Sequence, residues 1–231
     1  MDCRIADLLV RLEAGGRTAR QAGPYRVPAC PGPPDLVVSC DPGRVMEANP
    51  WITDRDTAEY MGTGADFARK LLAFSGLQLH ASAVELGGKA WLFSGPCGVG
   101  KSTHGEKWLR LFGAELLNDD KPALRRMEAG WMAYGTPWSG KHDLSRPAGA
   151  PVGALVFLAR GENHMERLRP TEALPLFLSQ TPRALPRQGL ERLLELADRL
   201  LREVPVWRLA CRDDDGAALL SHGALFREAG G

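Results

Sequence analysis

Cysteine is scarce in this sequence of 231 residues, and no two cysteines have the spacing of a metal-ligand pair. A small secreted domain held together by disulfides would need more closely spaced cysteines, and an even number of them. The odd number and the lack of clustering therefore favour a reducing compartment. The cysteines are Cys3, Cys30, Cys40, Cys97 and Cys211.

Long apolar runs and an excess of one charge are also missing. The longest apolar stretch, Pro151–Ala159, is far shorter than the roughly 20 residues of a membrane-spanning helix. Basic and acidic residues nearly balance, at 29 and 28, so bulk charge does not select a partner. Asp2 and Asp7 stand where a secretory signal carries basic residues. We expect a soluble, cytoplasmic protein with no nucleic-acid partner and no membrane partner.

The length and the pattern of apolar residues predict one compact unit with an extension in front of it. Residues 1–66 are expected to form an N-terminal extension packed on the core, and residues 67–231 the core itself. Within the extension, Ile5–Glu13 is predicted as a short helix and Pro34–Cys40 as a strand. The first core helix is expected to begin near Thr63, which would be its cap.

The core sequence predicts an α/β fold. Several short extended segments are separated by turns rather than by helices, which favours a mixed β-sheet over a purely parallel one. The expected elements are a strand, turn and strand over 77–94, a helix over 102–112, short strands up to 160, a helix over 188–204, a strand over 205–211 and a closing helix.

The segment between the second of these strands and the helix over 102–112 matches the phosphate-loop pattern G-x-x-x-x-G-K-[ST]. Glycines let the backbone wrap closely around phosphate oxygens, the lysine reaches the β- and γ-phosphates, and the serine hydroxyl binds magnesium. A glycine-rich turn without a ligand is the alternative, which the flanking strand and helix disfavour. The expected nucleotide-binding residues are Gly95, Gly98, Val99, Gly100, Lys101, Ser102 and Thr103.

Asp119 and Asp120 follow the strand predicted after this helix. Phosphate-loop proteins place here a carboxylate that completes magnesium coordination. Two carboxylates in tandem allow one to bind the metal while the other accepts a proton from an attacking hydroxyl. The alternative is a solvated acidic turn, with Lys121 as a neighbour and Pro122 ending the strand.

His80 is predicted to lie beside the phosphate loop because of strand register. If Gly87 and Gly88 form a two-residue hairpin turn, Leu86 pairs with Lys89 and His80 falls opposite Gly95. The imidazole could then contact the phosphates or hold an aspartate carboxylate in position. A purely structural histidine is the alternative.

The segment Gly135–Leu144 combines a Pro-Trp pair, flexible glycines and the polar residues Lys141 and His142. Such a composition suits a mobile flap next to an acceptor site, but it is also typical of an ordinary surface turn. The sequence leaves both interpretations open.

Taken together, these segments resemble the HPr kinase/phosphorylase-like family, whose fold is shared with the nucleotide-binding core of phosphoenolpyruvate carboxykinase. The resemblance covers about residues 67–215 and depends most on the spacing of His80 from Gly95 and on the tandem aspartates. It implies a mixed-sheet P-loop kinase core in which His80 and the aspartate pair are catalytic. The compact build looks more like relatives that phosphorylate a serine on a precursor peptide.

The sequence and the resemblance together predict a kinase that uses ATP, or GTP, with Mg²⁺. Its acceptor is expected to be a serine hydroxyl of a peptide or small protein. The predicted catalytic residues are His80, Lys101, Asp119 and Asp120, with Ser102 and Asp120 on the metal and Asp119 as base. The sequence does not decide which aspartate has which role. A kinase for a small metabolite such as free serine, a nucleotide sensor without transfer, and a homo-oligomer all stay open.

Overall fold

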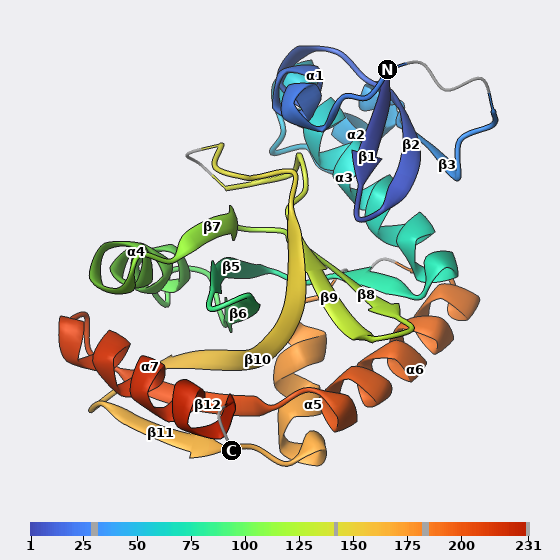
Figure 1. The fold of residues 1–231 in the computed structure, drawn as a ribbon. Helices are drawn as coiled ribbons and strands as arrows, with labels where there is room; N and C mark the ends of the chain where they lie inside the picture. The colour runs from blue at the N-terminus through green and yellow to red at the C-terminus, as the bar shows by residue number, and fades with distance from the viewer. Residues whose placement is uncertain (29–31, 141–142, 182–184, 230–231) are drawn as a thin grey trace.

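The computed structural model describes residues 1–28, 32–140, 143–181 and 185–229. In these ranges the chain forms two sheets, one of three strands near the N-terminus and one of nine strands. The two termini lie at opposite ends of the molecule (Figure 1). No helix among the described residues has both the length and the apolarity to cross a bilayer.

The N-terminal layer contains the three-stranded sheet and the helices around it, at the top of Figure 1. Strand β2 pairs antiparallel with β1 and parallel with β3. Helix α3 packs against α1, α2 and β3 and continues toward the large sheet. The elements are β1 (Asp2–Ile5), β2 (Leu8–Glu13), α1 (Gly16–Ala22), η1 (Gly23–Tyr25), β3 (Leu36–Ser39), α2 (Pro42–Ala48), α3 (Arg55–Leu71) and η2 (Leu72–Phe74).

The large sheet is mixed, as the sequence predicts. Its long strand β10 pairs parallel with β6 and β12 and antiparallel with β9. The strand order is β4-β8-β9-β10-β6-β5-β7, with β12 also on β10 and β11 on β12. The strands are β4 (Gly76–Gln78), β5 (Ala81–Leu86), β6 (Lys89–Ser94), β7 (Glu115–Asn118), β8 (Ala123–Met127), β9 (Gly130–Tyr134), β10 (Gly149–Arg160), β11 (His164–Arg167) and β12 (Val206–Cys211).

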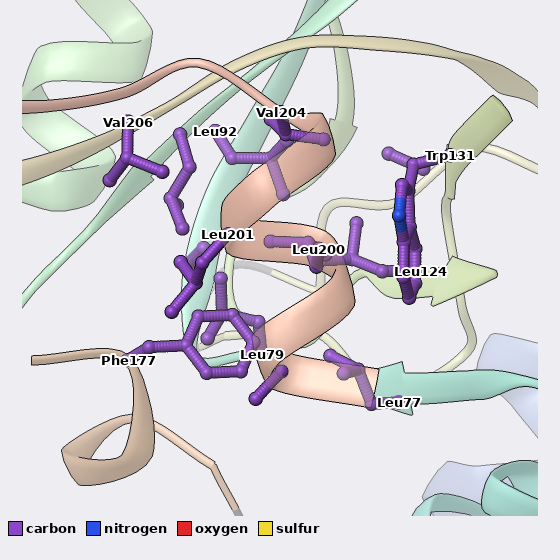
Figure 2. Close-up of a cluster of buried hydrophobic side chains, with 14 of the residues drawn as sticks. Leu77, Leu79, Leu92, Leu124, Trp131, Phe177, Leu200, Leu201, Val204 and Val206 are labelled. Carbon is purple, nitrogen blue, oxygen red and sulfur yellow. The ribbon is translucent and has the colours of Figure 1, made fainter. Parts of the chain in front are cut away.

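Helices cover both faces of this sheet (Figure 1). Successive side chains of a strand point to opposite faces, so Trp91 and Phe93 of β6 pack toward α4 and α7, while Leu92 packs toward α5 and α6. Figure 2 shows Leu200 and Leu201 of α6 in the latter core. These helices are α4 (Lys101–Phe112), α5 (Pro170–Ser179), α6 (Arg187–Glu203) and α7 (Asp215–Ala229).

The predicted helix Ile5–Glu13 is wrong, because this segment forms the hairpin of β1 and β2. Ala6 and Asp7 both have positive φ, as a two-residue hairpin turn requires, and Ile5 pairs with Leu8. Leu8 and Leu12 have helical spacing, yet burial alternates along β2 as in a strand. The Ala-Asp pair gives little sequence signal for such a turn.

Thr63 is not a helix cap, contrary to prediction. Helix α3 begins at Arg55, capped by Asp54, whose Oδ1 accepts a hydrogen bond of 2.7 Å from the Thr57 N–H. Thr63 is buried in mid-helix and donates its hydroxyl to the Glu59 carbonyl at 2.8 Å. Residue 66 therefore lies inside α3, and the division into extension and core stays a prediction.

Candidate active site

The connection between β6 and α4 takes a conformation that demands glycine. Gly95, Gly98 and Gly100 all have positive φ, and Gly100 caps α4. A Cβ on Gly95 would lie 2.9 Å from the Leu158 carbonyl oxygen of β10. The loop thus lies tightly against the sheet and ends at the N-terminus of α4, where the helix dipole favours an anion.

Lys101 is the first residue of α4 and is only 7% exposed. Its Nζ donates to the carbonyl oxygens of Gly95 at 2.9 Å and Pro96 at 3.1 Å. Burial lowers the pKa of Lys101, and the charge of Asp120 acts in the opposite direction. The amine is therefore held inside the curve of the loop.

Asn118 shapes the turn that carries the two aspartates. It is fully buried, and its Nδ2 donates to the carbonyl oxygens of Thr136 at 3.0 Å and Trp138 at 3.2 Å. Its Oδ1 accepts from the N–H groups of Asp120 at 2.9 Å and Lys121 at 2.6 Å, as in an Asx turn. This residue was not predicted as part of the site, although an asparagine directly before two aspartates is a turn signal.

The two carboxylates face different partners. Asp119 is 6% exposed, and its Oδ1 accepts a hydrogen bond of 2.5 Å from the Gly140 N–H. The Asp120 side chain is 25% exposed, and its Oδ1 lies 3.1 Å from His80 Nε2. Burial favours a higher pKa for Asp120, but the hydrogen bond from His80 and the charge of Lys121 outweigh it and lower the pKa. Asp120 is therefore ionised at neutral pH.

His80 lies where the predicted register places it. Leu86 pairs with Lys89 and Ala81 with Ser94, which confirms the register as far as Ala81, the residue directly after His80. The His80 N–H donates to the Gln180 carbonyl at 2.9 Å, and the His80 carbonyl accepts from Ser94 Oγ at 2.8 Å. Its backbone is thus fixed on both sides, and its ring is directed to an aspartate.

One cavity of about 370 Å³, here called the phosphate cavity, brings most of the predicted site residues together. Gly95 is not in its lining because it lies against β10, and Val99 lines a neighbouring cavity instead. Cys97 and Gly140 also contribute to the wall. The predicted residues in the lining are His80, Gly98, Gly100, Lys101, Ser102, Thr103, Asp119 and Asp120.

A larger cavity of about 790 Å³ adjoins the phosphate cavity and shares Gly98, Gly100 and Thr103 with it. Arg160 at the end of β10 donates from Nη2 to the Gly98 carbonyl at 3.1 Å. The remaining wall is rich in charged side chains, including Lys107, Glu162, Arg212 and Asp213.

The loop after β9 is held by the N-terminal layer. The hydroxyl of Tyr60, in α3, donates to the Ser139 carbonyl at 2.8 Å and accepts from the Ser139 N–H at 2.6 Å. Arg17, in α1, stacks on the Tyr60 ring and donates to Asp143 Oδ1 at 2.6 Å. Because Gly140 of the same loop donates to Asp119, the N-terminal layer supports the site indirectly.

The roles of Tyr60 and Arg17 were not predicted, since both residues lie far from the motifs in the sequence. The predicted flap residues Lys141 and His142 lie outside the described residues. The flap interpretation therefore stays a prediction, while Gly140 of the same loop lines the phosphate cavity.

Within the described residues, no group of three or more His, Cys, Asp or Glu side chains is arranged to hold a metal ion. Phosphoryl-transfer enzymes usually bind Mg²⁺ through one or two carboxylates together with the substrate phosphates. The Ser102 hydroxyl and the carboxylates of Asp119 and Asp120 line one cavity, which fits that mode.

No protein-family model matches the chain, and no curated protein matches it. Among solved structures, the Hpr(Ser) kinase/phosphatase from Coxiella burnetii is similar to it, with a TM-score of 0.37 and 12% sequence identity. The match covers 66% of this chain and 89% of that one. A similarity of this size says nothing about the activity of this chain.

Proposed function

We propose that the protein is a magnesium- and ATP-dependent kinase that transfers the γ-phosphoryl group to a serine hydroxyl of a peptide or small protein. One observation carries the proposal: a glycine-wrapped loop, a buried lysine and two carboxylates with different partners line the same cavity. Phosphoryl transfer needs mainly positioning and charge neutralisation, which these groups supply.

The phosphate end of the site is assigned to the loop and α4. Backbone N–H groups at the start of α4 and the Lys101 amine would hold the phosphates, because both are directed at the same space. Ser102 and Asp119 would hold Mg²⁺, which when bound neutralises charge on the phosphates. Asp119 fits this role because it is nearly buried and its orientation is fixed by the Gly140 N–H.

Asp120 is assigned as the base that accepts the proton of the serine hydroxyl. The serine oxygen forms a bond to the γ-phosphorus as the bond from that phosphorus to the β,γ-bridging oxygen breaks, and the nucleoside diphosphate leaves. The hydroxyl proton passes to the Asp120 carboxylate, which is ionised, partly exposed and paired with His80. His80 acts as a positioning residue that fixes this carboxylate. The sequence could not choose between the aspartates, and their surroundings favour this choice.

Mass spectrometry of candidate acceptors after incubation with the protein and Mg-ATP or Mg-GTP tests the proposal. The acceptors are serine-containing peptides, free serine and HPr. A gain of one phosphate by a peptide or by HPr, lost in Asp119→Asn and Asp120→Asn, is the expected result. Asp198→Asn is the matched control, because Asp198 lies on α6 and pairs with Arg202.

Other outcomes favour other functions. Phosphate on free serine alone would identify a metabolite kinase, and tightly bound, unconsumed nucleotide with no modified acceptor would identify a sensor. If both aspartate variants kept full transfer, the assigned mechanism would be wrong.

A further inference from the structure

A third cavity of about 470 Å³ opens beside His80 and Asp120, between α3 and the large sheet. We call it the acceptor groove. One wall is α3, another is the end of β4, and a third is the segment after α5. Its lining away from the phosphate cavity includes Met61, Gly64, Ala65, Ala68, Leu79 and Thr181.

The groove adjoins the phosphate cavity at the end where the proposed base lies. His80 and Asp120 line both spaces, so the proposed base faces the groove and the phosphates together. The large charged cavity joins the phosphate cavity at other residues, through Gly98, Gly100 and Thr103, and shares no lining residue with the groove. The three spaces thus form a series with the phosphate cavity in the middle.

This order matches the geometry of phosphoryl transfer. The attacking and leaving oxygens lie roughly in line on opposite sides of the phosphorus. The nucleoside then belongs in the large charged cavity, next to Thr103 and Arg160. The acceptor must approach from the other end, where the groove opens at Asp120.

The walls of the groove indicate what it binds. Helix α3 lines it with Gly64, Ala65 and Ala68, whose small side chains leave space, and Met61 adds apolar surface. Among its described lining residues, Lys121 is the one charged side chain besides the pair at Asp120. Free serine would leave most of this 470 Å³ cavity unfilled, because a cavity of this volume suits a larger ligand.

We propose that the acceptor groove binds a polypeptide segment in which the target serine is flanked by small or apolar residues. The inference rests on the proposed function, because it assigns the acceptor of the same reaction. The serine would reach Asp120 while its neighbours contact Met61 and Ala65 of α3. Apolar contact along the groove would supply the affinity, and the position of Asp120 would select the hydroxyl.

Peptide binding tests this separately from catalysis. Labelled nine-residue peptides with a central serine, flanked by alanine and leucine, by lysine, or by glutamate, are titrated into the full chain with Mg²⁺ and a non-hydrolysable ATP analogue. Fluorescence polarisation gives the dissociation constants. We expect the apolar-flanked peptide to bind at least about tenfold more tightly than the charged ones.

Two matched variants locate the peptide. Ala65 is exposed on the groove wall and Ala48 is exposed at the end of α2, outside the groove. Ala65→Trp should fill the groove and weaken peptide binding at least about tenfold while ATP-analogue affinity stays unchanged, and Ala48→Trp should change neither. Thermal unfolding of both variants checks that they are folded.

The outcomes separate the two proposals. Equal peptide binding by Ala65→Trp and the parent chain, or no binding of any serine peptide by the parent, overturns the groove assignment. Peptide binding that Ala65→Trp abolishes, with no phosphate ever transferred from Mg-ATP by the parent, supports the groove and overturns the kinase.

Discussion

The two ends of the candidate site are built in different ways. The phosphate end comes from one continuous segment, residues 95–103, whose shape depends on glycines with positive φ and on the start of α4. The acceptor groove is assembled from α3, the end of β4, the turn after β7 and the segment after α5. A locally built site can be identified from a motif, whereas an assembled site exists only once the fold brings its parts together.

The first and largest test of this difference is Asp120→Asn, at the acceptor end. Removal of the base should lower the turnover number about 10³-fold, while the affinity for Mg-nucleotide stays near that of the parent. Steady-state kinetics with a serine peptide and a separate nucleotide-binding titration measure both quantities. A large loss of nucleotide affinity with little loss of turnover would assign Asp120 to the metal instead. Asp120 would then belong to the phosphate end, and the distinction between the two ends would fail.

The second test, Lys101→Met, acts at the phosphate end. Loss of the buried amine should lower kcat/KM about 10²-fold and also weaken nucleotide binding, because this end holds the phosphates before and during transfer. Lys89→Met is the matched control, since Lys89 lies at the far end of β6 from the loop. If Lys101→Met bound nucleotide as tightly as the parent, the proposed position of the phosphates would be wrong.

The sequence predicted the locally determined features and missed the assembled ones. The tight glycine-rich turn before α4, the β5–β6 register and the mixed sheet follow from glycine positions, from a Gly-Gly turn and from short strand lengths. The hairpin at Ala6 and Asp7 was mistaken for a helix because the pair lacks the glycine typical of a two-residue hairpin turn, and because Leu8 and Leu12 have helical spacing.

The partners of Asn118 and the acceptor groove could not be predicted for another reason. The partners of Asn118, Thr136 and Trp138, come from a different loop. The groove depends on where α3 packs. The residue pattern within α3 does not determine that position. Such features need the tertiary structure, because the interactions that define them join segments far apart in the chain.

A third test asks whether the phosphate end depends on contacts outside its own segment, residues 95–103. His104, in α4, is buried, and its Nε2 lies 3.1 Å from Ser221 Oγ in α7. Burial lowers the pKa of His104 from 6.5 to about 4, so the unfolded chain binds this proton more tightly than the folded one. The free energy of unfolding should therefore fall as the pH drops from about 6.5 to about 4, by about 2 kcal/mol at pH 5.

Denaturant unfolding at a series of pH values measures this dependence. His104→Gln should remove most of the slope in that window, whereas His164→Gln, at an exposed position on β11, should preserve it. An unchanged slope in His104→Gln would show that the anchoring of α4 on α7 does not depend on a neutral imidazole.

The smallest expected effect tests whether the N-terminal layer serves both ends of the site. Tyr60 and Tyr134 each donate a hydroxyl hydrogen bond between this layer and the core, to the Ser139 carbonyl at 2.8 Å and to Asp7 Oδ2 at 2.5 Å. Tyr134→Phe should cost about 1 kcal/mol of unfolding free energy, and Tyr60→Phe about 2 kcal/mol, because it also leaves the buried Ser139 N–H without its acceptor. Only Ser139 belongs to the loop that holds Asp119.

The Mg²⁺ dependence of phosphoryl transfer should therefore differ between the two tyrosine variants. Tyr60→Phe should raise the Mg²⁺ concentration for half-maximal transfer several-fold, up to about tenfold, because Asp119 loses the support of its loop, whereas Tyr134→Phe should leave it unchanged. Equal shifts in both variants would mean that general stability, and not the position of Asp119, links the N-terminal layer to the reaction. Unequal shifts would mean that even the end built from one continuous segment needs an assembled support.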